Sequence, residues 1–369
     1  MNKSVGVNIM DKESVIVVFG ASGMVGNAIV TQLKEQGYKM IIGTYHSHRP
    51  DFDIELVKLD CTRQQDVEDF FNHYRPEYVF LAAAKVGGIV ANNTYKADFI
   101  YKNISIATNV IHSAYKFNTK KLLNLGSSCI YPKFAPQPLK EEYLLTGSLE
   151  PTNEPYAIAK IAAIKLCRYY NEQYNTNFIS VMPTNLYGIN DNFDLKNSHV
   201  LPALIRKFSL AKWLQEGDTE LLQKDVITFG LEELKDGGKE KIPEILKNIY
   251  GITDKVVTLW GTGSPKREFL YIDDAAQAAL FLMENYNYND IGEIINIGCG
   301  EDLTINDLSQ MVKDIVGYKG SIVFDKDKPD GTPQKLLDIN RMHKLGWDAK
   351  TSLEEGIKKV VNWYREKLQ

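Results

Sequence analysis

The chain has 369 residues, enough for one large domain or for two domains that share a cleft. Its hydrophobic content of 44% and charged content of 24% are typical of a globular protein and exclude predominant disorder. A formal net charge of -4 argues against nucleic-acid partners, and the absence of a long apolar run or a signal-peptide core predicts a cytoplasmic protein without membrane partners.

The first elements in chain order are a strand, a turn and a helix. Residues 15–19 form a β-rich apolar run, and residues 24–36 have a helical pattern that ends at Gly37. Further buried strands are predicted at residues 40–45, 56–59, 78–83, 121–125 and 178–182. Because helical stretches separate most of them, we predict an α/β fold whose doubly wound, Rossmann-like parallel sheet is covered on both faces.

Beyond Gly188 this alternation stops. A predicted helix at 199–210 precedes a charge-dense stretch at 212–255. Later segments predict a loop, strand and helix over 266–284, a strand at 294–297 and a last helix near 353–367. We expect a first domain at residues 12–188, with a return segment near 267–298, and a smaller, discontinuous α/β lobe within 189–369.

A glycine-rich turn joins the first strand to the first helix. Its candidate ligand-binding residues are Gly20, Ser22, Gly23, Met24, Val25 and Gly26. Such glycines let backbone amides approach a pyrophosphate, and the helix N-terminus adds partial positive charge. A tight packing turn is the alternative, but the strand-turn-helix context favours nucleotide binding. The GxxGxxG spacing is similar to that of short-chain dehydrogenases/reductases.

The end of the second strand bears on the choice of cofactor. It has no Asp or Glu to bind a free ribose 2′-hydroxyl and continues instead into a polar segment that ends at Arg49. A phosphate is compatible with this end, so NADPH is favoured over NADH, although an ordinary solvated loop explains Arg49 equally well. The resemblance to short-chain dehydrogenases/reductases implies that Asp60, at the end of the next strand, contacts the adenine, although Asp at a strand end is also a common turn former.

A tyrosine and a lysine lie one helical turn apart at Tyr156 and Lys160, and Ser127 precedes them after a strand. Side chains at i and i+4 share a helix face, so the ammonium is expected near the phenol and the cofactor ribose. We predict that its charge lowers the tyrosine pKa from about 10 and eases proton donation. Chance spacing is the alternative, but the order of glycine turn, serine and Tyr-x-x-x-Lys favours an extended short-chain dehydrogenase/reductase.

Longer strings make this resemblance specific. They are AAAKVGGI from Ala82, GSSCIYP from Gly126, EPTNEPYAIAK from Glu150, MPTNLYG from Met182, NSHVLPAL from Asn197, WGTGSPKREF from Trp260 and DGTPQKLLD from Asp330. In this order, and over nearly the whole chain, they resemble GDP-L-fucose synthase. That family comprises NADPH-dependent GDP-4-keto-6-deoxymannose 3,5-epimerase/4-reductases of nucleotide-sugar biosynthesis. The resemblance implies an NADP-binding first domain and a substrate-binding lobe.

The resemblance also implies roles for individual residues. Ser127, Tyr156 and Lys160 would serve the reduction, while Cys129 and His199 would serve epimerisation. Further cofactor contacts would come from Lys160, His199, Ala82, Ala83, Pro183, Thr184, Asn185 and Leu186. The GDP-sugar would contact Lys207, Trp260, Arg267 and Asp330. No metal site is expected, because the cysteines, Cys61, Cys129, Cys167 and Cys299, lack metal-ligand spacing.

The implied chemistry is coherent, although each residue has a simpler interpretation. A C4 ketone acidifies C3 and C5, so an acid and a base of the Cys129 and His199 types can invert either centre through an enolate. The Ser127 and Tyr156 hydroxyls would stabilise the enolate oxygen. Alternatively, Cys129 is a small buried hydrophobe, and His199 a helix-start residue near a cap at Ser198. Trp260 could likewise be core and Arg267 a surface ion pair.

The charged stretch at 212–255 lies between Lys207 and Trp260 and has the character of an insertion. It is either a surface excursion or a segment that reshapes the sugar pocket. Two enzyme hypotheses follow: a bifunctional epimerase/reductase, or a C4-reductase of another GDP-4-keto-deoxy sugar, such as a heptose, without epimerisation. A non-catalytic NADP-sensing protein is a third, which the presence of both Tyr156 and Lys160 disfavours.

Two predicted helices, residues 100–117 and 155–174, carry broad apolar faces. In similar enzymes two such helices from each subunit form a four-helix interface, so we predict a homodimer. The alternative is that the sheet buries both faces completely.

Overall fold

The structure, a computed structural model, describes residues 10–234, 238–328 and 330–369. The polar start of the chain, on which the expectation of a missing signal peptide rests, lies outside the described residues up to residue 9. Within the described ranges, no helix has the length and apolar character needed to cross a membrane.

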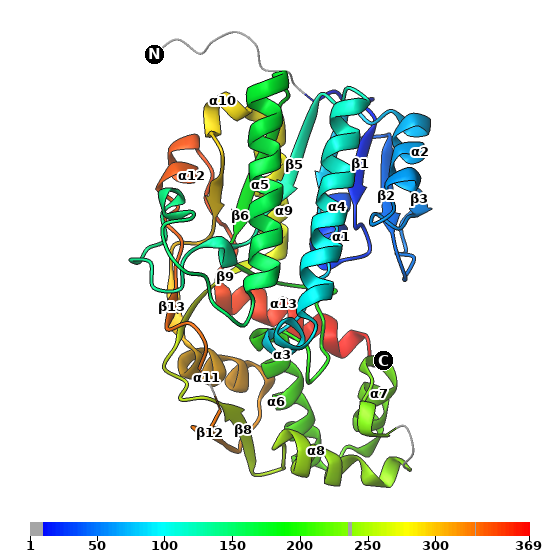
Figure 1. The fold of residues 1–369 in the computed structure, drawn as a ribbon. Coiled ribbons are helices and arrows are strands. Elements are labelled where there is room, and N and C mark those ends of the chain that lie inside the picture. Colours follow the sequence, from blue (N-terminus) through cyan, green and yellow to red (C-terminus); the bar gives the residue numbers. More distant parts are fainter. Residues whose placement is uncertain (1–9, 235–237, 329) are drawn as a thin grey trace.

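The central sheet has seven strands, all paired in parallel, in the order β10-β6-β5-β4-β1-β2-β3 (Figure 1). Their bounds are β1 Ile16–Phe19, β2 Ile41–Tyr45, β3 Glu55–Lys58, β4 Tyr78–Leu81, β5 Lys121–Leu125, β6 Phe178–Pro183 and β10 Ile295–Ile297. This arrangement confirms the predicted Rossmann-like α/β fold.

Apolar side chains fill both faces of this sheet. In β1, Ile16 and Val18 belong to one buried cluster, whereas Val17 and Phe19 belong to another on the opposite face. Burying such a side chain contributes about 1.5–3 kcal/mol. One face is covered by α2 (Gln64–Tyr74), α4 (Lys96–Lys116) and α5 (Glu154–Tyr174), the other by α1 (Met24–Glu35) and α9 (Ile272–Asn285).

In the sheet half, two boundaries differ from the sequence prediction by more than one residue. Helix α4 begins at Lys96 rather than at residue 100, directly after α3 (Ile89–Thr94). Strand β4 ends at Leu81 rather than at residue 83, because the chain leaves the sheet there to pass against the glycine turn. A Cβ atom placed on Gly20 would lie 2.8 Å from the Cα atom of Ala83, so these two backbones are in contact.

The smaller lobe lies beyond one end of the sheet, with α13 between the two parts (Figure 1). Strand β9 pairs with β7, β11 and β13, and β8 pairs with β12. The strands are β7 Asn185–Tyr187, β8 Val256–Trp260, β9 Lys266–Tyr271, β11 Asp302–Thr304, β12 Ser321–Asp325 and β13 Gln334–Lys335. The helices outside the sheet layers are α6 Val200–Glu216, α7 Thr219–Phe229, α8 Ile242–Tyr250, α10 Tyr288–Ile291, α11 Ile305–Val316, α12 Asn340–Leu345 and α13 Leu353–Glu366.

The charged stretch at 212–255 is not a surface excursion, so that interpretation is wrong. Helix α6 continues through Trp213, which is buried and stacks on Tyr364 of α13 with ring centroids 6.1 Å apart. Six further side chains of the stretch are buried in the same cluster as one face of the sheet, namely Leu222, Val226, Leu231, Ile242, Leu246 and Ile252. The prediction that the helix ends at residue 210 is wrong. Tertiary packing extends the helix, and the charge-rich sequence gives no sign of this packing.

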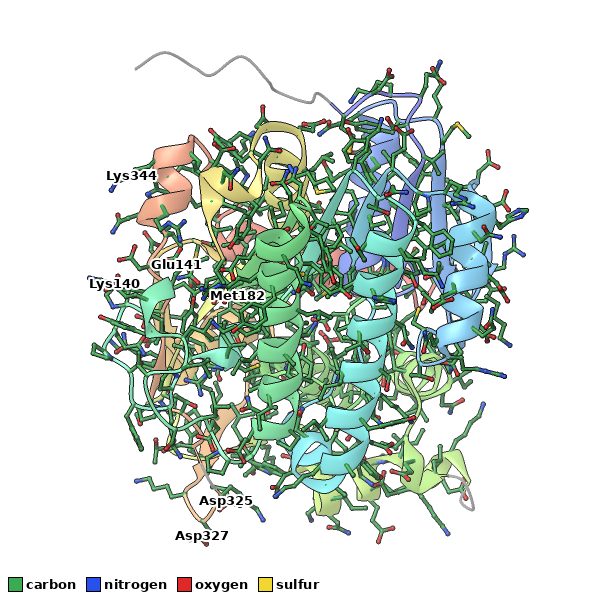
Figure 2. The ribbon with its side chains drawn as sticks, turned by 45° about the horizontal axis from the view of Figure 1, so that its top comes forward. Lys140, Glu141, Met182, Asp325, Asp327 and Lys344 are labelled. Atoms are coloured by element: carbon green, nitrogen blue, oxygen red, sulfur yellow. The ribbon has the colours of Figure 1, made fainter. Side chains whose placement is uncertain are left out.

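A long connection after β5 returns to the far edge of the sheet (Figure 2). Its Glu141 accepts a hydrogen bond from the backbone N–H of Asn296 in β10 at 3.1 Å and lies 3.5 Å from Arg341 of α12. Met182, also labelled in Figure 2, is fully buried at the end of β6. Asp325 and Asp327 lie at the outer end of the smaller lobe. The connection therefore packs against β10, the edge strand of the sheet.

Candidate active site

The glycine turn has the shape of a ligand cradle. Gly20 has a φ of +83°, and a Cβ on Gly26 would lie 2.1 Å from the Gly20 carbonyl oxygen, so the turn itself requires both glycines. Gly23 is different: it precedes α1, and its nearest neighbour would lie at 3.5 Å, which a side chain tolerates. Its missing side chain instead leaves the N-terminus of α1 open, which fits a pyrophosphate.

The residues predicted around the turn lie beside it, apart from Arg49. Ser22 is exposed, Met24 and Val25 are partly buried, and Ala83 touches Gly20. Arg49 is exposed beyond the end of β2.

Asp60 is engaged in a local turn. Its Oδ1 atom accepts hydrogen bonds from the Thr62 N–H at 3.0 Å and the Thr62 hydroxyl at 2.7 Å. The Thr62 hydroxyl lowers the pKa of the Asp60 carboxyl. Asp60 is therefore a turn former in this structure, and its contact with an adenine stays a prediction.

Four predicted catalytic residues meet at the carboxyl end of β5. Ser127 precedes a short 3₁₀ turn, and its Oγ atom accepts a hydrogen bond from the Cys129 N–H at 3.3 Å. On α5, Lys160 donates from Nζ to the carbonyl oxygen of Leu125 at 2.7 Å. The same Nζ atom lies 5.7 Å from the centre of the Tyr156 ring. Serine, thiol, phenol and ammonium thus share one strand end.

The prediction that Lys160 lowers the pKa of Tyr156 is wrong. Burial raises the pKa of the Tyr156 phenol, and the nearby Cys129 adds to the rise. Burial also lowers the pKa of Lys160 to about 8, because the buried ammonium has lost its hydration. The ammonium is directed at a carbonyl oxygen, so its effect on the phenol is outweighed by desolvation.

Helix α6 begins one residue later than predicted, so His199 lies directly before it. It is the N-cap residue of that helix, and the proposed cap, Ser198, has a buried hydroxyl without a partner in the described part of the chain. Desolvation by the surrounding protein lowers the pKa of the His199 imidazole, and the positive charge of Lys335 lowers it further. Burial raises the pKa of the Cys129 thiol. The two residues are therefore a neutral imidazole and a neutral thiol.

The segment predicted to line the nicotinamide pocket runs from Pro183 to Leu186 and crosses from β6 into β7. Thr184 donates its N–H to the Ile297 carbonyl at 3.0 Å. Its neighbour Asn185 donates from Nδ2 to the Glu268 carbonyl at 2.8 Å. The two central residues of the segment are thus held by backbone acceptors of β10 and β9.

The four predicted substrate residues form a second group on the smaller lobe. Lys207 of α6 donates from Nζ to the Thr258 carbonyl of β8 at 3.3 Å, and burial lowers its pKa to about 8. Trp260 ends the same strand and is 59% exposed, so it is not core. Asp330 accepts from the Thr262 N–H at 2.6 Å in the turn that follows Trp260.

Arg267 completes this group on β9. Burial lowers the pKa of its guanidinium, while the charges of Asp330 and Glu150 raise it. Arg267 donates from Nη1 to the Lys266 carbonyl oxygen at 2.7 Å and not to a carboxylate of the described residues, so the surface ion-pair interpretation finds no support.

Comparison with known proteins decides the family. A model of the NAD dependent epimerase/dehydratase family matches residues 16–230 and 228–298. GDP-L-fucose synthase 1 of Arabidopsis thaliana is 49% identical over 357 residues, covering 97% of this chain and 95% of the relative. The chain belongs to the GDP-L-fucose synthase family.

Two solved structures are also similar to this member of the GDP-L-fucose synthase family. A GDP-6-OMe-4-keto-L-xylo-heptose reductase from Campylobacter jejuni is 41% identical with a TM-score of 0.88, covering 98% of this chain and 100% of that one. A GDP-mannoheptose C4 reductase from Campylobacter jejuni with NADP bound is 41% identical with a TM-score of 0.82, covering 96% and 99%.

Lys335 is a residue of the site that sequence reasoning missed. It lies on β13 opposite Arg267 of β9, and burial lowers its pKa. With Cys129, Glu150 and Asn153 it lines a cavity of about 10 Å³, room for about one water molecule. Lys335 therefore connects the group around Cys129 with the group around Arg267. The family string from Asp330 contained this lysine, but spacing alone could not separate it from its neighbours.

The arrangement provides the parts of proton-transfer chemistry without metal ligands. In the described ranges no group of three or more His, Cys, Asp and Glu could hold a metal ion. A phenol and a serine hydroxyl are hydrogen-bond donors for a carbonyl oxygen, and a neutral thiol and a neutral imidazole are a proton donor and a proton acceptor. In a GDP-L-fucose synthase family member, these groups suit reduction and epimerisation next to the same ketone.

Proposed function

We propose that this chain catalyses the NADPH-dependent 3,5-epimerisation and 4-reduction of GDP-4-keto-6-deoxymannose in nucleotide-sugar biosynthesis. The observation that carries the proposal is the convergence of Ser127, Cys129 and the Tyr156–Lys160 pair at the end of β5. The 49% identity to a plant GDP-L-fucose synthase supports the same substrate.

The residues around the glycine turn fit an NADP cofactor. Gly23 and the open N-terminus of α1 would hold the pyrophosphate, Arg49 the 2′-phosphate, and residues 183–186 the nicotinamide side. The bound dinucleotide supplies the hydride. The relative from Campylobacter jejuni with NADP bound supports this cofactor. We accordingly assign residues 12–188 and the return segment near 267–298 to cofactor binding, and the remaining lobe to the substrate.

In the reduction, the side chains at the end of β5 handle the ketone oxygen. The Ser127 and Tyr156 hydroxyls donate hydrogen bonds to it, and Tyr156 transfers its proton as negative charge develops there. Because its pKa is raised, the phenol is fully protonated before the reaction. The Lys160 ammonium, held by the Leu125 carbonyl, lowers the cost of the phenolate that remains.

In the epimerisation, Cys129 and His199 act on the C–H bonds beside the same ketone. Inversion of either centre needs one group that removes a proton and one that returns a proton from the other side. A neutral imidazole and a neutral thiol supply one of each. The positive charge of Lys335 lowers the cost of a thiolate at Cys129.

The direct test is product analysis by NMR after incubation with NADPH and GDP-4-keto-6-deoxymannose in deuterated water. We expect a reduced product that carries deuterium at C3 and C5. A sugar that is neither reduced nor labelled would overturn the proposal.

A second candidate is C4-reduction of a GDP-4-keto-heptose without epimerisation. It is favoured by the TM-score of 0.88 to a heptose reductase of Campylobacter jejuni. The same NMR assay separates the candidates, because a heptose reductase would consume NADPH with the keto-heptose and leave C3 and C5 unlabelled. A non-catalytic NADP-sensing protein would show no turnover with either sugar.

We also propose that the protein is a cytoplasmic homodimer formed through α4 and α5. Four large side chains on these helices remain exposed in the single chain, namely Tyr101, Ile158, Tyr169 and Tyr174. Light scattering at micromolar concentration is expected to give the dimer mass, and a monomer mass would contradict the proposal. Ile158→Glu should favour the monomer.

A further inference from the structure

The stretch between α6 and β8 contacts the loop that carries His199. Lys196, three positions before His199 in the sequence, places its Nζ 2.5 Å from Glu233 and 3.0 Å from Glu232. Glu233 is the more buried of the two carboxylates, with 18% of its side chain exposed. The loop is therefore held from outside by a carboxylate that belongs to the charged stretch.

The same carboxylate is connected to the second group of site residues. Glu233 accepts a hydrogen bond from the Tyr250 hydroxyl at 2.7 Å. Tyr250 ends α8, and its carbonyl oxygen lies 3.5 Å from the Nζ atom of Lys207. Glu233 thus stands between the His199 loop and the residue that positions the Lys207 ammonium.

A buried ion pair fixes the base of this arrangement. Arg206, next to Lys207, is fully buried and donates to Asp225 of α7 at 2.8 and 3.0 Å. It also donates to the Phe193 carbonyl, in the His199 loop, at 2.9 Å, and to the Gly230 carbonyl at 2.6 Å. A buried charge with every donor directed in this way tolerates little displacement. The loop and the charged stretch are therefore held on one rigid base.

We propose that Lys196, Glu233 and Tyr250 form a brace that sets the position of His199 relative to Lys207. The inference rests on the proposed function, in which His199 faces the sugar and Lys207 the GDP. Lys196 and Glu233 are positioning residues, since they act through the loop. The brace fixes the span between the two ends of the substrate, so the charged stretch helps to determine which sugar fits.

The experiment compares three variants that remove or keep one charge each. Lys196→Gln removes the ion pairs with both carboxylates, Glu233→Gln removes the pair with Glu233, and Lys196→Arg keeps both. The matched control is Lys224→Gln, which breaks an ion pair of 3.0 Å with Glu220 on the exposed face of α7 in the same stretch. Lys196 and Lys224 are both 40% exposed, so no folding defect is expected from either substitution.

The first readout needs no substrate. Hydrogen–deuterium exchange of the backbone amides of residues 190–199 is expected to be about fivefold faster in Lys196→Gln and Glu233→Gln, because an ion pair of this kind contributes about 1 kcal/mol to local opening. Lys196→Arg and Lys224→Gln should match the wild type. An acceleration below about twofold in the first two variants overturns the brace.

The second readout is the labelling of C3 and C5 relative to reduction. Breaking the pair should lower the labelling rate about threefold to fivefold, leave the KM for the GDP-sugar within about twofold, and be rescued in Lys196→Arg. If the ratio of the labelling rate to the reduction rate is unchanged in these variants, the proposed brace is wrong. Another outcome is that the wild-type protein turns over no substrate while amide exchange of the loop is still faster in Lys196→Gln and Glu233→Gln. In that case the proposed function is wrong, but the structural role of the brace is retained.

Discussion

The sheet half and the smaller lobe hold their functional residues by different means. At the end of β5 the positions follow from the backbone: a strand end, a 3₁₀ turn at Ser127, and a helix that carries Tyr156 and Lys160. In the lobe, charged side chains set the positions, chiefly the fully buried pair of Arg206 and Asp225. Yet one apolar cluster runs from β1 into α6, α7 and α8 without a break.

Because of this difference, we expect substitutions in the sheet half to affect catalysis and substitutions in the smaller lobe to affect stability. A substitution at the strand end removes a reacting group and leaves the packing almost unchanged. A substitution in the buried ion pair of the lobe leaves an unpaired charge in the shared core and therefore lowers the stability of the whole chain. The following predictions test this separation, in order of decreasing effect.

The largest effect is expected from Tyr156→Phe. Removal of the phenol hydroxyl deletes the proton donor, so kcat for ketone reduction should fall by up to about 10⁴-fold. Thermal stability and NADPH binding, measured by fluorescence, should stay close to wild type. NADPH consumption at the wild-type rate would refute the assignment of this residue.

The opposite pattern is expected from Asp225→Asn. The substitution leaves Arg206 buried without its charge partner, which should lower the free energy of unfolding by about 3–5 kcal/mol in urea titrations. Lys224→Gln, one residue earlier but with a side chain that is 40% exposed, should change it by less than about 0.5 kcal/mol. Equal stabilities for the two variants would show that the lobe does not depend on its buried charge pair.

Cys129→Ala should separate the two proposed reactions. Labelling of C3 and C5 by deuterium should fall about 10²-fold, because the thiol that exchanges protons is missing. Reduction of a GDP-4-keto sugar that needs no inversion should stay within about threefold of wild type. If the labelling persists, Cys129 is only a buried packing residue.

The smallest effect is a pH dependence assigned to Lys160. Burial lowers its pKa to about 8, so the ammonium is present below that pH and is lost above it. We therefore expect kcat/KM for reduction to be level below about pH 8 and to fall about tenfold per pH unit above it. In Lys160→Arg, whose guanidinium keeps its charge, this alkaline fall should be absent even though overall activity is lower.

Much of the sheet half could be predicted because its determinants are local. Alternating strands and helices give the fold, and the Tyr-x-x-x-Lys spacing places Tyr156 and Lys160 on one helix face. The pKa of Tyr156 could not be predicted in the same way. It depends on how completely α5 and the connection after β5 exclude water, which is a property of the packed protein.

The lobe was harder to predict because its contacts join distant parts of the chain. Asp225 lies within a charge-rich stretch, and nothing local distinguishes it from its neighbour Lys224, whose side chain is 40% exposed. Lys335 likewise becomes part of the site only through the pairing of β13 with β9. The periodicity of a sequence predicts which face of an element is buried, but it does not predict which buried charges form ion pairs with one another.

Strand β9 contacts residues of both proposed binding regions. The Glu268 carbonyl accepts a hydrogen bond from Asn185, in the segment proposed for the nicotinamide, at 2.8 Å. The buried Glu268 carboxylate accepts one from the N–H of Leu337, two positions after Lys335, at 3.0 Å. Arg267, the adjacent residue, belongs to the substrate group. Any attempt to engineer a new sugar preference along this strand will therefore also alter dinucleotide affinity, so libraries built there should be screened for both at once.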